Sequence, residues 1–317
     1  MKTLIKLIGG LLLLLVGAAG LLILLSWEPD RPVEALKARW ALPPSQFVGV
    51  AGMQVHLRDE GPRDDGVPIV LLHGTSASLH TWDGWVEALK SDRRVIRFDM
   101  PGFGLTGPAP DSDYRIENYA RVLIALLDSL GIERCVLAGN SLGGQVAWVT
   151  AVLYPSRVER LVLVDAAGYP FEAQSVPIGF KIARLPLLSG LMERVLPRSI
   201  IESSVKNVYG DPSLVTPALV DRYFELTTRT GNRKALAERF RQAGPELPTE
   251  RLSSLTLPTL IVWGGQDRLI PPALGDRFQR EIAGSTLVRF EALGHVPQEE
   301  NPLLTVAALK QFLAQDE

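Results

Sequence analysis

The segment Gly139-Asn140-Ser141-Leu142-Gly143 matches the pattern G-x-S-x-G and follows the short apolar run Cys135–Ala138. A serine in this pattern, at a turn between a strand and a helix, is held in a strained and exposed position that suits a nucleophile. Side chains at the two glycine positions would collide with neighbouring backbone. The motif predicts attack by Ser141 on a carbonyl group; the alternative is a glycine-rich turn whose serine caps the next helix.

A serine hydroxyl is a weak nucleophile unless a base lies within hydrogen-bond reach. The chain has four histidines, His56, His73, His80 and His295, and only His295 follows Ser141. In the chain order serine, acid, histidine, His295 is therefore the candidate base. The alternative for His295 is an ordinary histidine in a surface loop.

The acid of such a site must orient the imidazole and stabilise its charged form. Asp267 is the first candidate, because it lies in a turn directly after the apolar run 260–263. Asp165 also ends an apolar run and is the main rival. If Asp165 is not the acid, its expected role is to cap a turn.

These residues lie at the ends of short apolar runs, as expected for buried parallel strands. Helical patterns alternate with the runs, which predicts a mostly parallel central sheet with helices on both faces. Two earlier segments, Phe47–Val50 and Gln54–Asp59, predict an antiparallel hairpin at one edge. The predicted strands are 67–72, 94–98, 135–138, 161–164, 260–263 and 287–290, and the predicted helices are 82–89, 116–130, 142–154 and 302–313.

The alternation stops between Tyr169 and about Pro258. This stretch has helical apolar patterns without a convincing strand, and several prolines divide it into short helices. Because alternation resumes afterwards, we expect a helical cap inserted between two strands. A separate C-terminal domain is the less favoured alternative.

The run from Leu7 to Leu25 contains no charged residue and as a helix would span about 28 Å, close to the hydrocarbon thickness of a bilayer. It predicts a retained transmembrane anchor; a cleaved signal peptide and a buried core helix are the alternatives. Lys2 and Lys6 precede the run, so the positive-inside rule places the remaining chain outside the cytoplasm, on the periplasmic side in a bacterium.

The expected organisation therefore has four parts. Residues 1–28 form the anchor, and residues 29–45 form a juxtamembrane helix or linker. Residues 46–168 and 258–317 form the core, and residues 169–257 form the cap, or lid. Gly10 and Gly17 lie seven residues apart in the anchor, a spacing that favours close contact between two copies of the helix in a homodimer.

Composition excludes several classes of protein. The 33 lysines and arginines nearly balance the 35 aspartates and glutamates, which argues against a nucleic-acid-binding protein. The single cysteine, Cys135, excludes a disulfide framework and multi-cysteine metal sites. We expect neither a metal nor an organic cofactor in the reaction.

Five motifs together resemble the α/β-hydrolase superfamily, in the branch of esterases, lipases and carbon–carbon bond hydrolases. The resemblance covers roughly residues 47–315 and implies the fold and the Ser141, Asp267 and His295 triad. It also implies an oxyanion hole made by the backbone N–H groups of Leu142 and Thr75. The motifs are His73-Gly74-Thr75, Asp99-Met100-Pro101-Gly102-Phe103-Gly104, Gly139-Asn140-Ser141-Leu142-Gly143-Gly144, Gly264-Gly265-Gln266-Asp267 and Gly294-His295.

An anchored domain with an apolar cap resembles the membrane-bound lipases and phospholipases of bacterial envelopes. The leading expectation is therefore hydrolysis of a fatty-acyl ester (a lysophospholipid, phospholipid or monoacylglycerol) through an acyl-enzyme. The anchor would contact membrane lipids. The alternatives are a carbon–carbon hydrolase acting on ring-cleavage diketones and a non-catalytic binding module that kept the fold.

Three further polar residues have structural expectations. We expect His73 to shape its loop and Asp99 to tie the following Pro-Gly turn. His56 is expected to be an exposed residue on an edge strand.

Overall fold

The computed structural model describes residues 2–185, 190, 193–243 and 249–316, and it contains an eight-stranded sheet. The strands lie in the order β1-β2-β4-β3-β5-β6-β7-β8, and every pair from β4 to β8 is parallel. The predicted hairpin is present: β2 pairs antiparallel with both β1 and β4. The strands are β1 (Gln46–Val50), β2 (Met53–Glu60), β3 (Ile69–Leu72), β4 (Val95–Phe98), β5 (Cys135–Asn140), β6 (Val158–Val164), β7 (Thr259–Gly264) and β8 (Thr286–Phe290).

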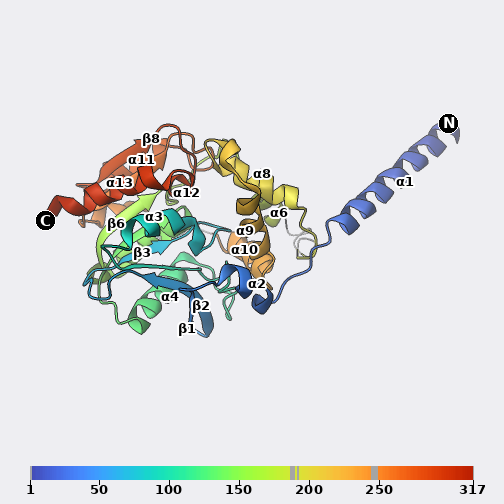
Figure 1. Cartoon of the computed structure of the whole chain (residues 1–317). Helices are drawn as coiled ribbons and strands as arrows, with labels where there is room; N and C mark the ends of the chain where they lie inside the picture. The colour runs from blue at the N-terminus through green and yellow to red at the C-terminus, as the bar shows by residue number, and fades with distance from the viewer. Residues whose placement is uncertain (1, 186–189, 191–192, 244–248, 317) are drawn as a thin grey trace.

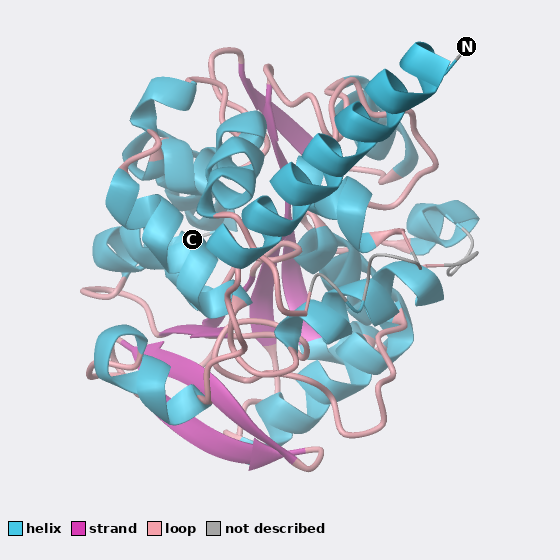
Figure 2. Ribbon diagram, turned by 90° about the vertical axis from the view of Figure 1, so that its right-hand side faces the viewer, coloured by secondary structure: helices cyan, strands magenta, loops and turns pink. Residues whose placement is uncertain are grey.

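Helices cover both faces of the sheet, as the alternating pattern predicts (Figure 2). On one face, α3 (Asp83–Leu89) and α13 (Pro302–Leu313) pack over side chains such as Leu71 and Val262. On the other face, α4 (Ile116–Ser129), α5 (Leu142–Leu153) and α11 (Ala273–Glu281) enclose the larger core cluster. The middle strands are buried on both faces, which explains their continuous apolar runs.

Between β6 and β7, the described chain forms four helices that we call the cap helices: α6 (Ile178–Ala183), α8 (Arg198–Val208), α9 (Pro217–Thr227) and α10 (Asn232–Gln242). They lie together at one end of the molecule, coloured yellow to orange in Figure 1. Short elements complete the chain: α12 (Pro297–Glu300), η1 (Leu79–Trp82), η2 (Pro155–Arg157), η3 (Pro212–Leu214), η4 (Thr249–Ser254) and η5 (Ala314–Asp316).

The N-terminal helix α1 (Lys2–Leu25) projects away from the rest of the molecule (Figure 1). Its part from Lys6 to Leu25 has a mean hydropathy of 2.7 and is not buried in the structure. In the described chain it is the one helix long and apolar enough to cross a bilayer, a test that a signal sequence also passes.

A short helix, α2 (Val33–Trp40), follows, where the sequence predicts one. Its apolar side is covered by protein, because Leu36 packs against Leu105 and the cap residue Leu226. The segment between α1 and α2 also pairs with the chain around the cap helices: Leu196 N–H donates to the Ser26 carbonyl, and Glu28 N–H donates to the Arg194 carbonyl. The segment that links α1 to α2 is thus hydrogen-bonded to the chain around the cap helices.

Candidate active site

Ser141 lies at the junction of β5 and α5 with a backbone φ of 55° and ψ of −115°. A positive φ is strained for a residue with a side chain, and such strain is concentrated at functional sites. The flanking glycines are required by space: a Cβ on Gly139 would lie 2.2 Å from the Gly143 carbonyl oxygen, and one on Gly143 would lie 2.3 Å from the Leu72 carbonyl oxygen. The expected collision with backbone is therefore present at both positions.

His295 is held beside this turn by its main chain. The side-chain amide of Asn140, the residue before the serine, donates to the carbonyl oxygens of His295 and Val164 at 2.9 and 3.2 Å. His295 N–H donates to the Val208 carbonyl at 2.8 Å, at the end of α8. The histidine loop is thus fixed both to the serine turn and to the cap.

Asp267 is the acid that contacts His295. Its Oδ2 lies 2.7 Å from His295 Nδ1, and its Oδ1 accepts the backbone N–H groups of Leu269 and Ile270 at 2.8 and 2.9 Å. Both members of the pair are buried. This arrangement fixes the carboxylate and makes Nδ1 the protonated nitrogen, so that Nε2 is free to accept a proton.

The rival acid, Asp165, is close but is bonded differently. Its Oδ1 accepts the Gly264 N–H at 3.0 Å, and its carboxylate lies in a group with Asp267 and His295 whose polar atoms are within 4.8 Å of one another. Burial and the neighbouring Asp267 carboxylate raise the pKa of Asp165 well above its usual range. The geometry therefore favours Asp267 as the partner of the imidazole and a neutral Asp165 beside it.

The same three residues are a group in the described chain whose side-chain types could hold a metal ion. His295 Nδ1 and Asp267 Oδ2 are already hydrogen-bonded to each other at 2.7 Å, so a cation would have to break that pair. The donor set fits a proton-transfer pair better than a metal centre.

Two backbone N–H groups fit the expected oxyanion hole. Leu142 is the first residue of α5, so its N–H has no acceptor within the helix. Thr75 lines the cavity in front of Ser141. A Cβ on the adjacent Gly74 would lie 3.2 Å from Ser141 Cβ, which shows how closely this loop approaches the serine.

Ser141 and His295 open into a cavity of about 100 Å³ between the sheet and the cap helices. Its wall is mainly apolar, and in the described chain Arg233 and His295 are its only Lys, Arg or His side chains. The lining residues are Gly74, Thr75, Ser76, Ala77, Asn140, Ser141, Pro177, Gly179, Phe180, Leu196, Ile200, Ile201, Ser204, Val205, Val208, Tyr223, Thr227, Arg233, Leu236, Leu269, His295 and Val296.

Two residues of this region are absent from the sequence-based predictions. Glu300 accepts the N–H groups of Gly210, Asp211 and Gly294, and so joins the histidine loop to the cap. Arg233 lies on α10, 92 residues from Ser141 in the chain. No motif marks either residue, since both act through contacts between distant segments.

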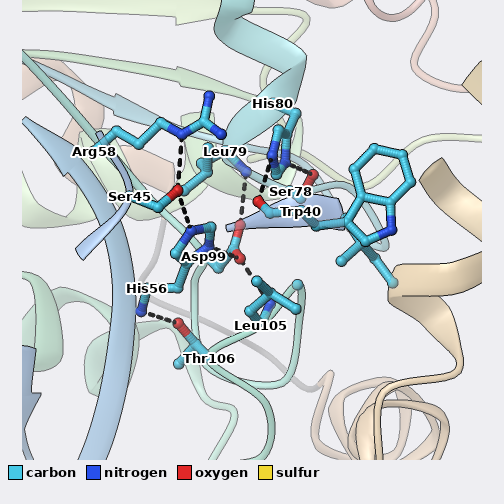
Figure 3. Close-up of polar contacts among 12 residues, drawn as sticks. Trp40, Ser45, His56, Arg58, Ser78, Leu79, His80, Asp99, Leu105 and Thr106 are labelled. Atoms are coloured by element: carbon cyan, nitrogen blue, oxygen red, sulfur yellow. Dashed lines mark hydrogen bonds and ion pairs between the residues drawn. The ribbon is translucent and has the colours of Figure 1, made fainter. Parts of the chain in front are cut away.

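His56 is not the exposed edge residue that the sequence predicts. It lies on β2, between β1 and β4, and is completely buried. Figure 3 shows its ring between Asp99 and Ser45, with Nδ1 2.7 Å from Asp99 Oδ2 and Nε2 2.9 Å from Ser45 Oγ. The prediction is wrong because the segment after α2 covers this end of the strand.

This second group of serine, histidine and aspartate ties loops together. Asp99 accepts the N–H groups of Leu79 and Leu105, which agrees with its predicted role at the Pro-Gly turn (Figure 3). Arg58 donates to Ser45 Oγ at 3.0 Å. Ser45 is not among the residues that line the cavity at Ser141.

Two other histidines are structural as well. His80 Nε2 lies 3.1 Å from the Trp40 carbonyl at the end of α2, and burial lowers the pKa of His80 to about 3. His73 Nδ1 donates to the Gly74 carbonyl while Nε2 accepts the Met100 N–H. His73 therefore shapes its loop, as predicted.

Known proteins and solved structures are similar to this protein over most of its chain. A 2-hydroxy-6-oxo-2,4-heptadienoate hydrolase from Pseudomonas putida is 31% identical over 86% of this chain and 97% of its own length. The structure of a meta-cleavage product hydrolase from Pseudomonas fluorescens IP01 matches with a TM-score of 0.74 and 26% identity, over 86% of this chain and 98% of that one. A structure described as a membrane phospholipase A and a bacterial virulence factor matches with a TM-score of 0.73 and 25% identity, over 99% and 98% of the two chains.

These relatives correct the leading functional expectation. The curated relative at 31% identity is a dienoate hydrolase, and the phospholipase structure is less similar in sequence. The expectation of fatty-acyl ester hydrolysis is therefore wrong, and the findings favour the alternative of a carbon–carbon bond hydrolase. The triad motif does not separate the two, since both reactions begin with attack on a carbonyl.

The family model described as the alpha/beta hydrolase fold matches residues 67–302, which include Ser141, Asp267 and His295. The parallel sheet, the serine turn and the inserted helices agree with that match. The chain belongs to the α/β-hydrolase family and is a hydrolase of that type.

Proposed function

We propose that this protein hydrolyses a carbon–carbon bond next to the ketone of a ring-cleavage acid of the 2-hydroxy-6-oxo-dienoate type. The observation that carries the proposal is the similarity to the dienoate hydrolase over 97% of that relative's length. The bonded His295–Asp267 pair and the cavity shared by Ser141 and His295 support it. The small-molecule substrate would bind in that cavity.

Each residue of the site has a role in this reaction. Ser141 Oγ attacks the ketone carbon while His295 Nε2 takes the hydroxyl proton, and Asp267 stabilises the charged imidazole. Cleavage requires the keto tautomer of the substrate, in which the 2-hydroxyl proton has moved to C5, the carbon next to the ketone. The tetrahedral intermediate of this tautomer then loses the C5–C6 bond, whose electron pair passes into the conjugated 2-oxo group of the leaving fragment and forms a dienolate. His295 returns the proton to the leaving group. Water next attacks acyl-Ser141, which releases a carboxylic acid and restores the serine.

The negative charge on the oxygen of the intermediate needs donors that are already in place. We assign this role to the N–H groups of Leu142 and Thr75. Each such donor lowers the barrier by about 3 kcal/mol in sites of this kind.

The test is an absorbance assay of the full-length, detergent-solubilised protein with 2-hydroxy-6-oxo-2,4-heptadienoate, whose conjugated chromophore is lost on cleavage. We expect turnover by the wild type and a loss of about 1,000-fold or more in Ser141→Ala. Ser45→Ala is the matched control, because Ser45 belongs to the other serine–histidine–aspartate group. Turnover of p-nitrophenyl esters without any turnover of the dienoate would overturn the proposal.

We further propose that α1 is a retained anchor and that the folded body lies outside the cytoplasm. The apolar surface of the helix and its projection from the body support the anchor. Lys2 and Lys6, which precede the apolar run, support the location of the body outside the cytoplasm. The test is membrane fractionation after high-salt and carbonate washes, together with protease protection in intact spheroplasts. A protein found in the soluble fraction with its N-terminus removed would instead indicate a cleaved signal peptide.

A further inference from the structure

Arg233 stands out in the cavity because of its charge. It is the second residue of α10, and it lines the same cavity as Ser141 and His295. Most of the remaining wall is apolar. A guanidinium group beside an apolar cavity loses hydration energy, which hydrogen-bonding partners must replace.

Two residues of the segment after α1 supply part of that replacement. Arg233 Nε and Nη2 donate to Asp30 Oδ1 at 3.0 and 2.6 Å, and Nη2 also donates to the Glu28 carbonyl at 2.8 Å. Asp30 is itself held, since its Oδ2 accepts the Gly231 N–H at 2.8 Å. The edge of the guanidinium group that carries Nε and Nη2 is therefore fixed in position.

The other terminal nitrogen has no such partner. Arg233 is only 5% exposed, and Nη1 makes no hydrogen bond with any described residue. Buried donors without an acceptor are rare and costly in folded proteins. Arg222, whose side chain is 14% exposed, shows the contrast: its Nη2 donates to Glu299 Oε2 at 2.6 Å. A ligand in the cavity could supply the hydrogen-bond acceptor that Nη1 of Arg233 lacks.

We propose that Arg233 forms an anion subsite in this cavity, at which Nη1 donates to the carboxylate of an acidic substrate. A carboxylate is the acceptor that a guanidinium group bonds most strongly, and the apolar wall suits the hydrocarbon part of a conjugated acid. The identity of that acid, a 2-hydroxy-6-oxo-dienoate, rests on the proposed function. The subsite itself requires only a carboxylate on a short unsaturated chain.

The test separates binding from turnover. Full-length Ser141→Ala protein in detergent is titrated calorimetrically with sorbate (hexa-2,4-dienoate) and with its neutral amide, sorbamide. We expect sorbate to bind about 10-fold more tightly than sorbamide, as a charge-assisted hydrogen bond implies. Adding Arg233→Met should abolish that preference. Lys234→Met, which removes an exposed charge from the same helix, should leave it unchanged.

Arg233→Lys guards against a failure of the methionine variant to fold. A lysine can keep the ion pair with Asp30, but it has no second terminal nitrogen for a ligand, so it should also lose the preference. A sorbate preference that persists in both variants would overturn the subsite, and Nη1 would then be satisfied by water.

The outcomes for the subsite and for the reaction are distinct. Loss of the sorbate preference in the variants, together with no turnover of a dienoate by the wild type, would keep the subsite and reject the proposed reaction. Turnover of the dienoate with an equal KM in wild type and Arg233→Met would keep the reaction and reject the subsite. If both proposals hold, Arg233→Met should raise the KM for the dienoate about 10-fold and change kcat much less.

Discussion

At the scale of single residues, two buried carboxylates lie beside one histidine, and they differ in their hydrogen bonds. Asp267 bonds the imidazole and accepts two backbone N–H groups, while Asp165 accepts one N–H and favours its protonated form. Two like charges this close would repel, so one of the two carboxyl groups keeps its proton. The division of roles follows from these contacts.

Asparagine substitutions should separate the two roles. Asp267→Asn removes the acceptor that stabilises charged His295, and we expect kcat/KM for the dienoate to fall about 100-fold or more. Asp165→Asn keeps a neutral group of the same shape and should retain activity within about 3-fold of the wild type. The measurement is steady-state kinetics of both variants. The reverse order of effects would make Asp165 the acid.

The pH dependence of stability gives an independent check on Asp165. The unfolded chain releases this proton near the ordinary aspartate value, about pH 4, whereas the folded protein holds it to a higher pH. The contribution of Asp165 to stability therefore falls as pH rises above about 4, and Asp165→Asn lacks that loss. We expect the Tm of the variant minus that of the wild type to be more positive at about pH 8 than at about pH 5. An equal difference at both pH values would show that Asp165 is ionised.

The sequence predicts the residues of this site unevenly, for a physical reason. Ser141 is marked by its glycines, and His295 is the one histidine that follows it in the chain. Glu300 and Arg233 are marked by nothing local, because their roles come from contacts with the cap and with the segment after α1. Substrate class depends on such residues, which explains why the triad could be proposed while the expected lipid substrate was wrong.

At the scale of elements, the turn from β5 to α5 works because three chain segments meet without side chains between them. Gly139 faces the Gly143 carbonyl, and Gly143 faces the carbonyl of Leu72 at the end of β3. Their distances leave no space for a methyl group. The strain at Ser141 is thus maintained by the packing of two strands and a helix.

Gly139→Ala should therefore destabilise the fold as well as the site. The new Cβ would overlap the backbone of α5, and we expect a loss of about 3 kcal/mol, seen as a Tm lower by about 6 °C or more. Gly66→Ala is the matched control, since its Cβ meets nothing within 4 Å in an exposed loop. Thermal unfolding followed by circular dichroism measures both. Equal Tm values for the two variants would contradict the packing argument.

The positions of strands could be predicted well, because they depend on a local pattern of apolar residues. The burial of single residues could be predicted poorly, because it depends on segments that are distant in the sequence. The six predicted parallel strands and the hairpin are all present, since each apolar run ends at a turn residue. The burial of His56 could not be predicted, because alternation along β2 does not reveal the cover from the segment after α2. The sequence pattern does not predict helix α11, because its residues are mostly polar or charged and only Gly275 and Phe278 in it are buried.

At the scale of the whole molecule, the segment between α1 and α2 has two roles. It links α1 to the folded body, and it holds a residue that lines the cavity. Trp27 pairs with Val195, Arg31 N–H donates to the Thr228 carbonyl, and Asp30 holds Arg233. Helix α2 is in turn bound to cap helix α9, because the Arg39 and Trp40 side chains donate hydrogen bonds to Glu225. Movement of the cap relative to the anchor would therefore break bonds that position a residue of the cavity.

Two truncations should separate the anchor from this support. Removal of residues 1–25 takes away the proposed anchor but keeps the bonds from Ser26 to Arg31, so the protein should leave the membrane fraction with its KM for the dienoate unchanged. Removal of residues 1–31 also breaks the partly buried pair between Asp30 and Arg233. We expect the free energy of unfolding to fall by about 2 kcal/mol and the KM to rise about 10-fold. Asp30→Asn in the full chain is the matched control, because it should raise KM while the protein stays in the membrane. If both truncations had the wild-type KM and Tm, the segment would be a simple linker, and the orientation of Arg233 would depend on the cap alone.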